Sequence, residues 1–357
     1  MATDRTTGAK PTPAESLDVP RRFLRVPDLE EFMTRPSRAL VDDLARVDGD
    51  IIVLGVGGKM GPTLAGLAKR AAPRKRVIGV ARFSESGVRE KLASWGVEPV
   101  ACDLLDRAAV ARLPRLENVV FMAGRKFGST GVEHLTWAMN ALAPAIVAET
   151  FANSRIVAFS TGCVYPFGDV SSGGADESMP AKPPPGEYAN SCVARERMFE
   201  YFSRKLGTPG RLVRLNYAID MRYGVLHDVA RRVHVGAPID LGTGHVNVIW
   251  QGDANAQALR ALGRCTTPTS PLNVTGLETV SIRALAATFG ERLGRRANFA
   301  GEEAPTAWLS NAGEAARLFG APDVPLRQMI EWTAAWIEDG GESLNKDTHY
   351  GTRDGEF

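Results

Sequence analysis

A turn rich in glycine, placed between an apolar run and a helical segment, constrains this chain more than any other feature of its sequence. Residues 51–54 read Ile-Ile-Val-Leu, a continuous apolar run typical of a strand buried on both faces of a parallel sheet. Gly55, Gly58 and Gly61 follow, and the Ala/Leu-rich stretch from Thr63 predicts a helix. Glycines at this spacing let the backbone turn tightly and approach a pyrophosphate, which the N–H groups of the first helical turn then hold. The pattern predicts a dinucleotide-binding turn; the alternative is an ordinary glycine-rich turn.

Strand-like and helix-like segments alternate from this turn to residue 216. Apolar runs bounded by turn residues predict strands, and longer segments with helical periodicity predict helices between them. Strict alternation of this kind is typical of a doubly wound parallel sheet, the Rossmann fold of the α/β class. A helix is also expected before the first strand, over 38–45, with Ser37 as its N-cap. The expected strands are 51–54, 75–81, 98–102, 118–124, 155–161 and 211–216, and the expected helices between them are 63–71, 88–95, 134–153 and 187–206.

The alternation loosens beyond Asn216, which predicts a second, smaller unit. Such a lobe would cover the carboxyl edge of the sheet, where ligands bind in open α/β folds. Both ends of the chain are polar; the C-terminal end is either disordered or covers a neighbouring subunit. The expected division is a flexible tail over 1–25, a dinucleotide-binding domain over 26–216 to which 245–275 returns, a substrate-binding lobe from 217–244 and 276–340, and a tail over 341–357.

Composition excludes several classes of partner. The chain carries 43 basic and 41 acidic side chains, so we expect neither a nucleic-acid nor an anionic-membrane partner. No apolar run approaches the roughly 20 residues of a membrane span, and residues 1–20 lack the apolar core of a signal peptide. The four cysteines are scattered, without metal-ligand spacing or a disulfide framework. We therefore expect a cytoplasmic protein with reduced thiols and no bound metal.

The order of motifs resembles the extended short-chain dehydrogenase/reductase family, of the NAD-dependent epimerase/dehydratase type, over roughly residues 51–336. The resemblance rests on Gly-x-x-Gly-x-x-Gly at 55–61, on Asp103-Leu104 after the third strand and on Ala123-Gly124 after the fourth. Residues 160–165 (Ser-Thr-Gly-Cys-Val-Tyr) are similar to the family's Ser-Ser-x-x-Val-Tyr block. The resemblance implies that Asp103 contacts the adenine amino group and that Ala123-Gly124 lies along the cofactor. The expected cofactor-binding residues are Gly55, Gly58, Lys59, Met60, Gly61, Arg82, Asp103, Leu104, Ala123, Gly124 and Tyr188.

The end of the second strand bears on the choice of cofactor. An NAD-binding strand usually ends in an acid that bonds the adenosine ribose, whereas a 2′-phosphate requires cations. Here the position is Ala81, followed by Arg82, and Lys59 lies inside the glycine loop. Both cations are placed where they could reach a 2′-phosphate, Arg82 in a bidentate fashion. We favour NADP over NAD; the alternative is that both are solvated surface charges.

Two tyrosines compete for the catalytic position that the resemblance implies. The family uses Tyr-x-x-x-Lys on one helix, so that the lysine holds the ribose and lowers the tyrosine pKa. Tyr201 and Lys205 match this motif, but Tyr201 lies late in its helix. Tyr188 lies at the helix start, at the family's distance from Thr161, which would position the substrate oxygen. We assign Tyr188 as the catalytic tyrosine and Tyr201 as structural.

This assignment puts Cys192 in the place of the lysine. A thiol is not cationic at neutral pH, so it cannot replace the ammonium group. Three interpretations follow: the cation is recruited elsewhere, with Lys126 and Arg125 as candidates; the chemistry depends less on an acidic tyrosine; or the cofactor is bound without turnover. Cys163 and Cys192 would also flank the site as a thiol pair or, alternatively, as small core residues.

The resemblance places the substrate, often a nucleotide sugar, near the end of the sixth strand. The expected substrate residues are Arg125, Asn216 and Arg222, with Arg214 and Tyr223 nearby; the alternative for the arginines is a structural ion pair. We expect an NAD(P)-dependent oxidoreductase or epimerase acting on a hydroxyl or keto group of a sugar-like substrate. The alternative is a non-catalytic sensor or scaffold with a degraded site. The resemblance also implies a homodimer through helices 134–153 and 187–206.

Overall fold

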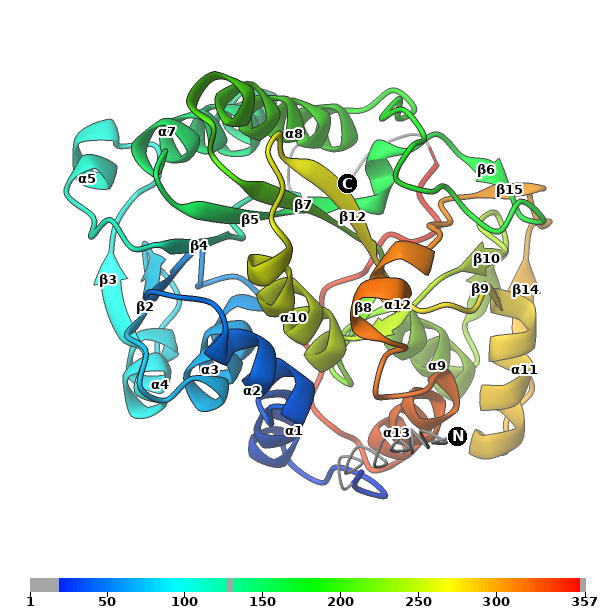
Figure 1. Ribbon diagram of the computed structural model, residues 1–357. Coiled ribbons are helices and arrows are strands. Elements are labelled where there is room, and N and C mark those ends of the chain that lie inside the picture. Colours follow the sequence, from blue (N-terminus) through cyan, green and yellow to red (C-terminus); the bar gives the residue numbers. More distant parts are fainter. Residues whose placement is uncertain (1–18, 127–130, 354–357) are drawn as a thin grey trace, which may run out of the picture.

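A parallel sheet of seven strands forms the centre of the molecule (Figure 1). The computed structural model describes residues 19–126 and 131–353. The strand order is β12-β7-β5-β4-β1-β2-β3, and all neighbouring pairs are parallel. The chain therefore winds in opposite directions from β1, which creates a topological switch point between β1 and β4. The expected Rossmann fold is confirmed. The strands are β1 (Ile51–Leu54), β2 (Val77–Ala81), β3 (Glu98–Ala101), β4 (Asn118–Phe121), β5 (Arg155–Thr161), β7 (Gly210–Leu215) and β12 (Ser270–Val274).

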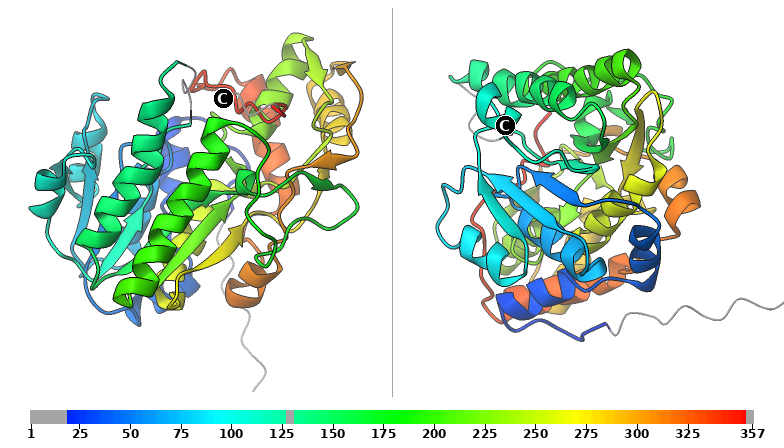
Figure 2. Two further views of the ribbon diagram at one scale, coloured as in Figure 1. Left: turned by 90° about the horizontal axis from the view of Figure 1, so that it is seen from above. Right: turned by 60° about the vertical axis from the view of Figure 1, so that its left-hand side comes forward.

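Helices cover both faces of this sheet. One face carries α2 (Arg38–Ala45), α3 (Gly61–Ala71), α4 (Val88–Ser94) and α10 (Gln251–Arg260). Neighbouring helices on this face include α2 and α10, which are far apart in the sequence but in contact. The other carries α5 (Arg107–Ala111), α6 (Glu133–Trp137), α7 (Ala143–Thr150) and α8 (Glu187–Leu206), and Figure 2 shows α7 beside α8 on the outside of the molecule. Ser37 caps α2 as expected, since its Oγ accepts the N–H of Leu40.

A second group of helices packs beyond the carboxyl ends of β5, β7 and β12. Here α9 (Val225–Val235) lies between α11 (Ile282–Leu293) and α13 (Leu326–Glu338), with α12 (Gly313–Phe319) near β12. Short strand pairs join this group to the sheet edge. The pairs are β6 (Gly168–Asp169) with β15 (Thr306–Ala307), β8 (Ala218–Ile219) with β11 (Ile249–Trp250), β9 (Pro238–Asp240) with β14 (Asn298–Ala300), and β10 (His245–Val246) with β13 (Val280–Ser281).

The described parts of both expected tails are packed against the rest of the chain. Phe23 is buried against Phe32, Trp250 and Trp332, just before α1 (Val26–Met33). Beyond α13 the chain returns towards the sheet (red in Figure 1), and Tyr350 is buried. We had expected tails over 1–25 and 341–357; residues 19–25 and 341–353 are instead part of the fold, because their aromatic side chains find apolar partners.

The helix expected over 134–153 is interrupted. Between α6 and α7 lies a π-helical turn, η1 (Ala138–Leu142), which contains the fully buried Asn140. The Asn140 side chain accepts the Arg125 N–H (2.9 Å) and donates to the Arg125 carbonyl oxygen (2.9 Å). It thereby fixes the loop after β4. Single π-helical turns are frequent at functional sites, where they re-aim a side chain.

Candidate active site

The glycine loop after β1 is shaped by close backbone packing. Gly55 has φ of +91°, and a Cβ placed on it would lie 2.6 Å from the Cα of Ala123. A Cβ on Gly61, the first residue of α3, would fall against the Val56 carbonyl oxygen and 2.6 Å from its carbon. At Gly58 a Cβ would meet only the Gly55 carbonyl oxygen, at 3.7 Å. The loop is therefore closed on the protein side and open on the ligand side, as a pyrophosphate cradle requires.

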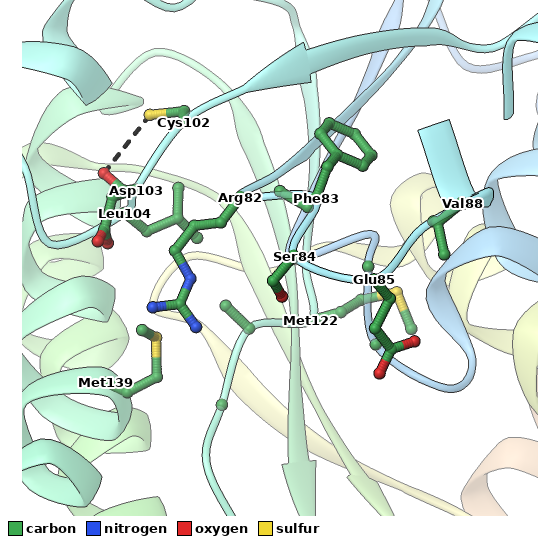
Figure 3. Close-up of a pocket in the computed structure, with 16 residues that line it drawn as sticks. Arg82, Phe83, Ser84, Glu85, Val88, Cys102, Asp103, Leu104, Met122 and Met139 are labelled. Atoms are coloured by element: carbon green, nitrogen blue, oxygen red, sulfur yellow. Dashed lines mark hydrogen bonds between the residues drawn. The ribbon is translucent and has the colours of Figure 1, made fainter. Parts of the chain in front are cut away.

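Two pockets adjoin this loop at the carboxyl edge of the sheet. The outer pocket, of about 220 Å³, lies at the ends of β1 to β4 and contains Arg82, Asp103, Leu104 and Ala123. Figure 3 shows the Arg82 side chain extending toward Met139, away from the Glu85 carboxylate. The remaining lining residues of the outer pocket are Gly55, Gly57, Gly58, Ala81, Phe83, Ser84, Glu85, Val88, Cys102, Met122, Gly124 and Met139.

The central pocket, of about 460 Å³, lies at the ends of β1, β4, β5 and β7. It shares Gly58 and Gly124 with the outer pocket, so a ligand along the glycine loop would reach both. The remaining lining residues of the central pocket are Lys59, Met60, Arg125, Lys126, Ser160, Thr161, Cys163, Tyr188, Leu215, Asn216, Tyr217, Ala218, Tyr223, Gly224, Lys346 and Thr348.

Thr161 and Tyr188 meet in the central pocket. Thr161 is the last residue of β5 and Tyr188 lies in the first turn of α8, and both residues line this pocket. Burial raises the pKa of Tyr188 well above its usual value, whereas the Arg195 guanidinium and the Thr161 hydrogen bond act in the opposite direction. Tyr201, in contrast, is 53% exposed near the other end of α8.

Cys192 lies one turn after Tyr188 and is fully buried. Burial raises the pKa of its thiol to about 11, so the thiol is neutral at physiological pH. The cation nearest to this position along the helix is Arg195, which is also buried. Its Nη1 donates to the Phe159 carbonyl oxygen (2.9 Å) and its Nη2 to Asn140 Oδ1 (2.6 Å). A Cβ on Gly124 would lie 2.5 Å from this Nη2, so the guanidinium packs directly behind the pocket wall.

Two lysines enter the central pocket from different loops. Lys126, after β4, has its Nζ 5.8 Å from the centre of the Tyr188 ring and donates to the Thr348 carbonyl oxygen at 3.1 Å. Lys59, in the glycine loop, has its Nζ 3.7 Å from the centre of the Tyr223 ring. We had expected Lys59 to join Arg82 at a 2′-phosphate. The structure separates them, because Lys59 lines the central pocket and Arg82 the outer one.

Two predicted substrate residues also bond to the protein itself. Arg222 lines neither of the two pockets: it is buried, with Nη2 2.7 Å from Asp220 Oδ2 and Nη1 3.2 Å from Glu30 Oε1. These carboxylates hold the guanidinium in a structural network, which corrects the expectation of a substrate ligand. Asn216 does line the central pocket, and its Nδ2 donates to the Trp308 carbonyl oxygen at 3.1 Å. Arg214 pairs with the buried Glu196, as the structural alternative expected.

Several pocket residues were missed by sequence reasoning. Tyr217 has φ of +41°, a strained conformation for a residue with a side chain, and such strain often marks functional sites. Lys346 and Thr348 reach the pocket from the segment after α13, which no local pattern connects to the site. Arg195 could have been found from the sequence, because a residue seven positions after Tyr188 lies on the same face of the helix.

The sheet order and the glycine loop define an α/β protein with a Rossmann fold of the short-chain dehydrogenase/reductase type. The sequence profile of the NAD dependent epimerase/dehydratase family matches residues 51–253, which is more than half of the chain. The chain belongs to this family, and the resemblance carried by its motifs is confirmed. No curated protein sequence matches the chain significantly.

Solved structures support the fold assignment. UDP-glucose 4-epimerase from Thermotoga maritima, solved with UDP-glucose, is similar with a TM-score of 0.68 at 18% identity, covering 82% of this chain and 99% of that one. UDP-glucuronic acid 4-epimerase from Bacillus cereus, solved with UDP-glucuronic acid and NAD, has a TM-score of 0.67 at 17% identity, covering 81% and 99%. Within the described residues, no helix combines the length and apolarity needed to cross a bilayer.

Proposed function

We propose that this protein is an NAD(P)-dependent epimerase or oxidoreductase that acts on a hydroxyl or keto group of a nucleotide sugar. The observation that carries the proposal is that Thr161 and Tyr188 line one pocket together with Gly58 and Gly124, the residues that this pocket shares with the outer one. The open face at Gly58 fits a dinucleotide pyrophosphate. A bound nicotinamide cofactor supplies the hydride acceptor or donor.

The protein's own groups then handle the substrate oxygen. Thr161 holds this oxygen by a hydrogen bond, and the Tyr188 hydroxyl gives it a proton as a carbonyl is reduced, or takes the proton back as a hydroxyl is oxidised. The positive charges that stabilise the tyrosinate come from Lys126, within the pocket, and from Arg195, behind its wall. Cys192 contributes no charge because its thiol is neutral.

We further propose that NADP is the preferred cofactor, with Arg82 as the residue that reads the 2′-phosphate. Support comes from Ala81, which ends β2 without a carboxylate, and from Arg82, which enters the outer pocket directly after it. An arginine matches a phosphate in a bidentate manner. Lys59 no longer contributes to this argument, since it lines the other pocket.

A titration with NADPH, NADH, NADP and NAD, followed by fluorescence and thermal stability, tests both proposals. We expect tighter binding of the phosphorylated forms and a loss of this preference in Arg82→Ala, with Arg89→Ala, an exposed change in α4, as the control. A substrate screen with the preferred cofactor then compares Tyr188→Phe with Tyr201→Phe. Unchanged turnover in Tyr188→Phe would refute the catalytic role, and no binding of any dinucleotide would refute the enzyme proposal.

A non-catalytic dinucleotide sensor is the second candidate, and the observation in its favour is the neutral Cys192 at the lysine position. It predicts dinucleotide binding without turnover of any nucleotide sugar. Retention of Thr161 and Tyr188 together in a pocket of about 460 Å³ favours the enzyme.

We also propose that the protein forms a homodimer through α6, η1 and α8. Support comes from the large apolar side chains that these helices expose to solvent, because association of two subunits would bury such side chains. The residues concerned are Leu135 (41% exposed), Trp137 (39%), Leu142 (47%), Tyr201 (53%) and Leu206 (44%).

A further inference from the structure

We propose that Lys59 and Lys126 form a binding site for an oxyanion, a carboxylate or a phosphate, on the part of the substrate that lies beside Tyr188. The inference rests on the proposed function, because it takes the central pocket as the substrate site. It adds that the reacting sugar is itself acidic, and it assigns the residues that recognise the acidic group.

The first argument is the charge of the central pocket. Its described lining contains four cationic side chains, Lys59, Arg125, Lys126 and Lys346, and no aspartate or glutamate. A pocket lined by one sign of charge concentrates ligands of the opposite sign. Since the chain as a whole is almost neutral, at +2, this local excess belongs to the pocket and not to the protein surface in general.

The second argument is the environment of Lys59. Its Nζ lies over the Tyr223 ring, and within the described parts of the chain no ion pair involves it. Burial lowers the pKa of Lys59 to about 7, and the charges of Lys126 and Arg222 act in the same direction. Asp220 and Asp228 oppose this shift, but Asp220 is paired with Arg222 and Asp228 accepts hydrogen bonds from Thr348. The charged form of a desolvated ammonium group with a like charge nearby is strongly stabilised when an anion binds beside it.

The third argument is position. Lys126 Nζ lies 5.8 Å from the Tyr188 ring centre, so an anion held by Lys126 lies beside the tyrosine to which we assign proton transfer. The Tyr223 ring fixes the direction of Lys59, as cation–π contacts do. The two ammonium groups thus approach the substrate space from the β1 loop and the β4 loop, respectively.

Isothermal titration at pH 8 in the presence of saturating cofactor tests this site. The ligands are UDP-glucuronic acid, UDP-glucose and UDP, of which only the first carries a sugar carboxylate. We expect Lys59→Met to lower the affinity for UDP-glucuronic acid at least about tenfold and the affinity for UDP-glucose by less than about threefold. The difference corresponds to the loss of a charge-assisted hydrogen bond to the sugar carboxylate. The control Lys205→Met makes the same change on the exposed face of α8.

Proton linkage gives a readout that a structural role of Lys59 would not produce. An anion favours the charged ammonium, so the protein should take up a proton at Lys59 when UDP-glucuronic acid binds at pH 8. Titration in two buffers of different ionisation enthalpy measures this uptake, and Lys59→Met should abolish it. Equal uptake with UDP would assign the lysines to the nucleotide diphosphate, and uptake on cofactor binding alone would assign Lys59 to the cofactor. Either result would overturn the proposal.

A second measurement is independent of nucleotide-sugar binding and of catalysis. Reductive ¹³C-methylation labels the lysines, and the signal absent from Lys59→Met identifies Lys59 in the NMR spectrum. We expect glucuronate to move this signal at pH 8 in the cofactor-saturated protein, with glucose as the neutral control. A shift with inorganic phosphate but none with glucuronate would indicate a phosphate site, whereas no shift with either anion would refute an oxyanion site. The proposed function would stand or fall separately, on the cofactor titration and the Tyr188 variant.

Discussion

The glycine loop allows one prediction in which stability and cofactor binding separate. Gly61→Ala places a methyl group 2.6 Å from the Val56 carbonyl carbon, whereas Gly58→Ala meets nothing closer than 3.7 Å. We therefore expect Gly61→Ala to destabilise the apoprotein and Gly58→Ala to leave its stability unchanged. For dinucleotide binding we expect a large loss in Gly58→Ala, because its methyl group would occupy the space that the pyrophosphate needs.

The expected magnitudes follow from the geometry. A contact of 2.6 Å in place of an ordinary 3.4 Å or more forces the backbone to move by about 0.8 Å or more, and overpacking of this kind costs about 1–3 kcal/mol. Gly55→Ala adds about 1–2 kcal/mol, because its φ of +91° is unfavourable for alanine. An unfolding entropy of about 2.1 cal/mol/K per residue gives about 0.75 kcal/mol/K for 357 residues. The melting temperature should thus fall by about 1–4 °C in Gly61→Ala and about 3–7 °C in Gly55→Ala.

Calorimetry of the three apoproteins measures the stability change, and dinucleotide titration of each folded variant measures the affinity. We expect at least a tenfold loss of affinity in Gly58→Ala, or about 1.4 kcal/mol. A melting temperature that falls as far in Gly58→Ala as in Gly61→Ala would refute the reasoning, since the two sites would then have the same packing. Undiminished affinity in Gly58→Ala would show that the open side of the loop is not the ligand side.

Three further predictions concern the dimer, a buried carboxyl and the lysine position. Leu142→Glu should shift the protein to a monomer in analytical ultracentrifugation, while Leu277→Glu, equally exposed but outside α6, η1 and α8, should not. Burial raises the pKa of Asp253 to about 8 from its unfolded value of about 3.9, so the folded state binds this proton more tightly and wild-type stability falls as pH rises from about 4 to 8. Asp253→Asn should therefore raise the melting temperature by at least about 2 °C at pH 9 and change it little at pH 4.5; an equal effect at both would contradict the assignment. Cys192→Lys should lower the pKa of Tyr188 in a spectroscopic titration relative to the volume control Cys192→Met, and an unchanged tyrosine pKa would show that this position does not govern it.

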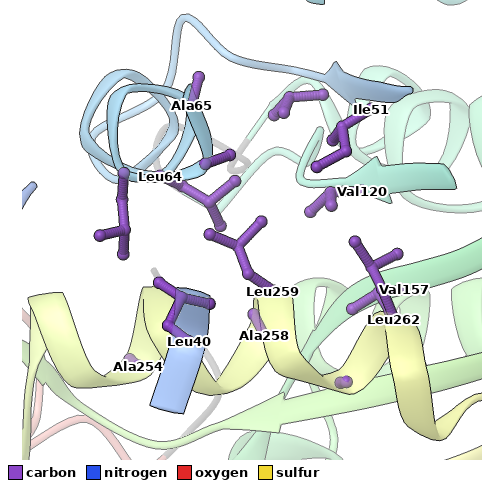
Figure 4. Packing of buried hydrophobic residues seen from close by; sticks show 14 of the residues in the cluster. Leu40, Ile51, Leu64, Ala65, Val120, Val157, Ala254, Ala258, Leu259 and Leu262 are labelled. Atoms are coloured by element: carbon purple, nitrogen blue, oxygen red, sulfur yellow. The ribbon is translucent and has the colours of Figure 1, made fainter. Parts of the chain in front are cut away.

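The sheet was predictable from the sequence because burial on two faces leaves a local pattern. Ile51 and Val53 of β1 pack into the cluster under α2, α3 and α10, part of which Figure 4 shows, whereas Ile52 and Leu54 pack into the cluster under α7 and α8. A strand with both faces covered must be apolar at every position, and residues 51–54 are. The glycine loop was predictable for a related reason: only glycine permits the close approaches at Gly55 and Gly61.

The direction of individual side chains was not predictable in this way. Lys59 and Arg82 line different pockets because of the shape of the glycine loop. Arg222 forms ion pairs with Asp220 and with Glu30, which is almost two hundred residues away in the chain. Thr348 is held at the central pocket by Asp228, in α9, which accepts its N–H at 3.0 Å, and by Lys126, which donates to its carbonyl oxygen at 3.1 Å. Such contacts depend on tertiary geometry, and no period or spacing in the sequence records them.

The missing lysine has a physical consequence for the acidity of Tyr188. An ammonium at position 192 would act on Tyr188 from one helical turn away, whereas Arg195 follows Tyr188 by about two turns of α8 and is hydrogen-bonded to neutral acceptors behind the pocket wall. Its charge lowers the pKa of Tyr188 without overcoming the effect of burial, and the hydroxyl stays protonated. A tyrosine with a raised pKa is protonated but is a weak acid, so it gives its proton to a substrate oxygen only where nearby positive charge stabilises the tyrosinate. We therefore expect proton transfer in either direction to require a charged Lys126 while the substrate is bound, because its Nζ lies 5.8 Å from the centre of the Tyr188 ring, inside the same pocket.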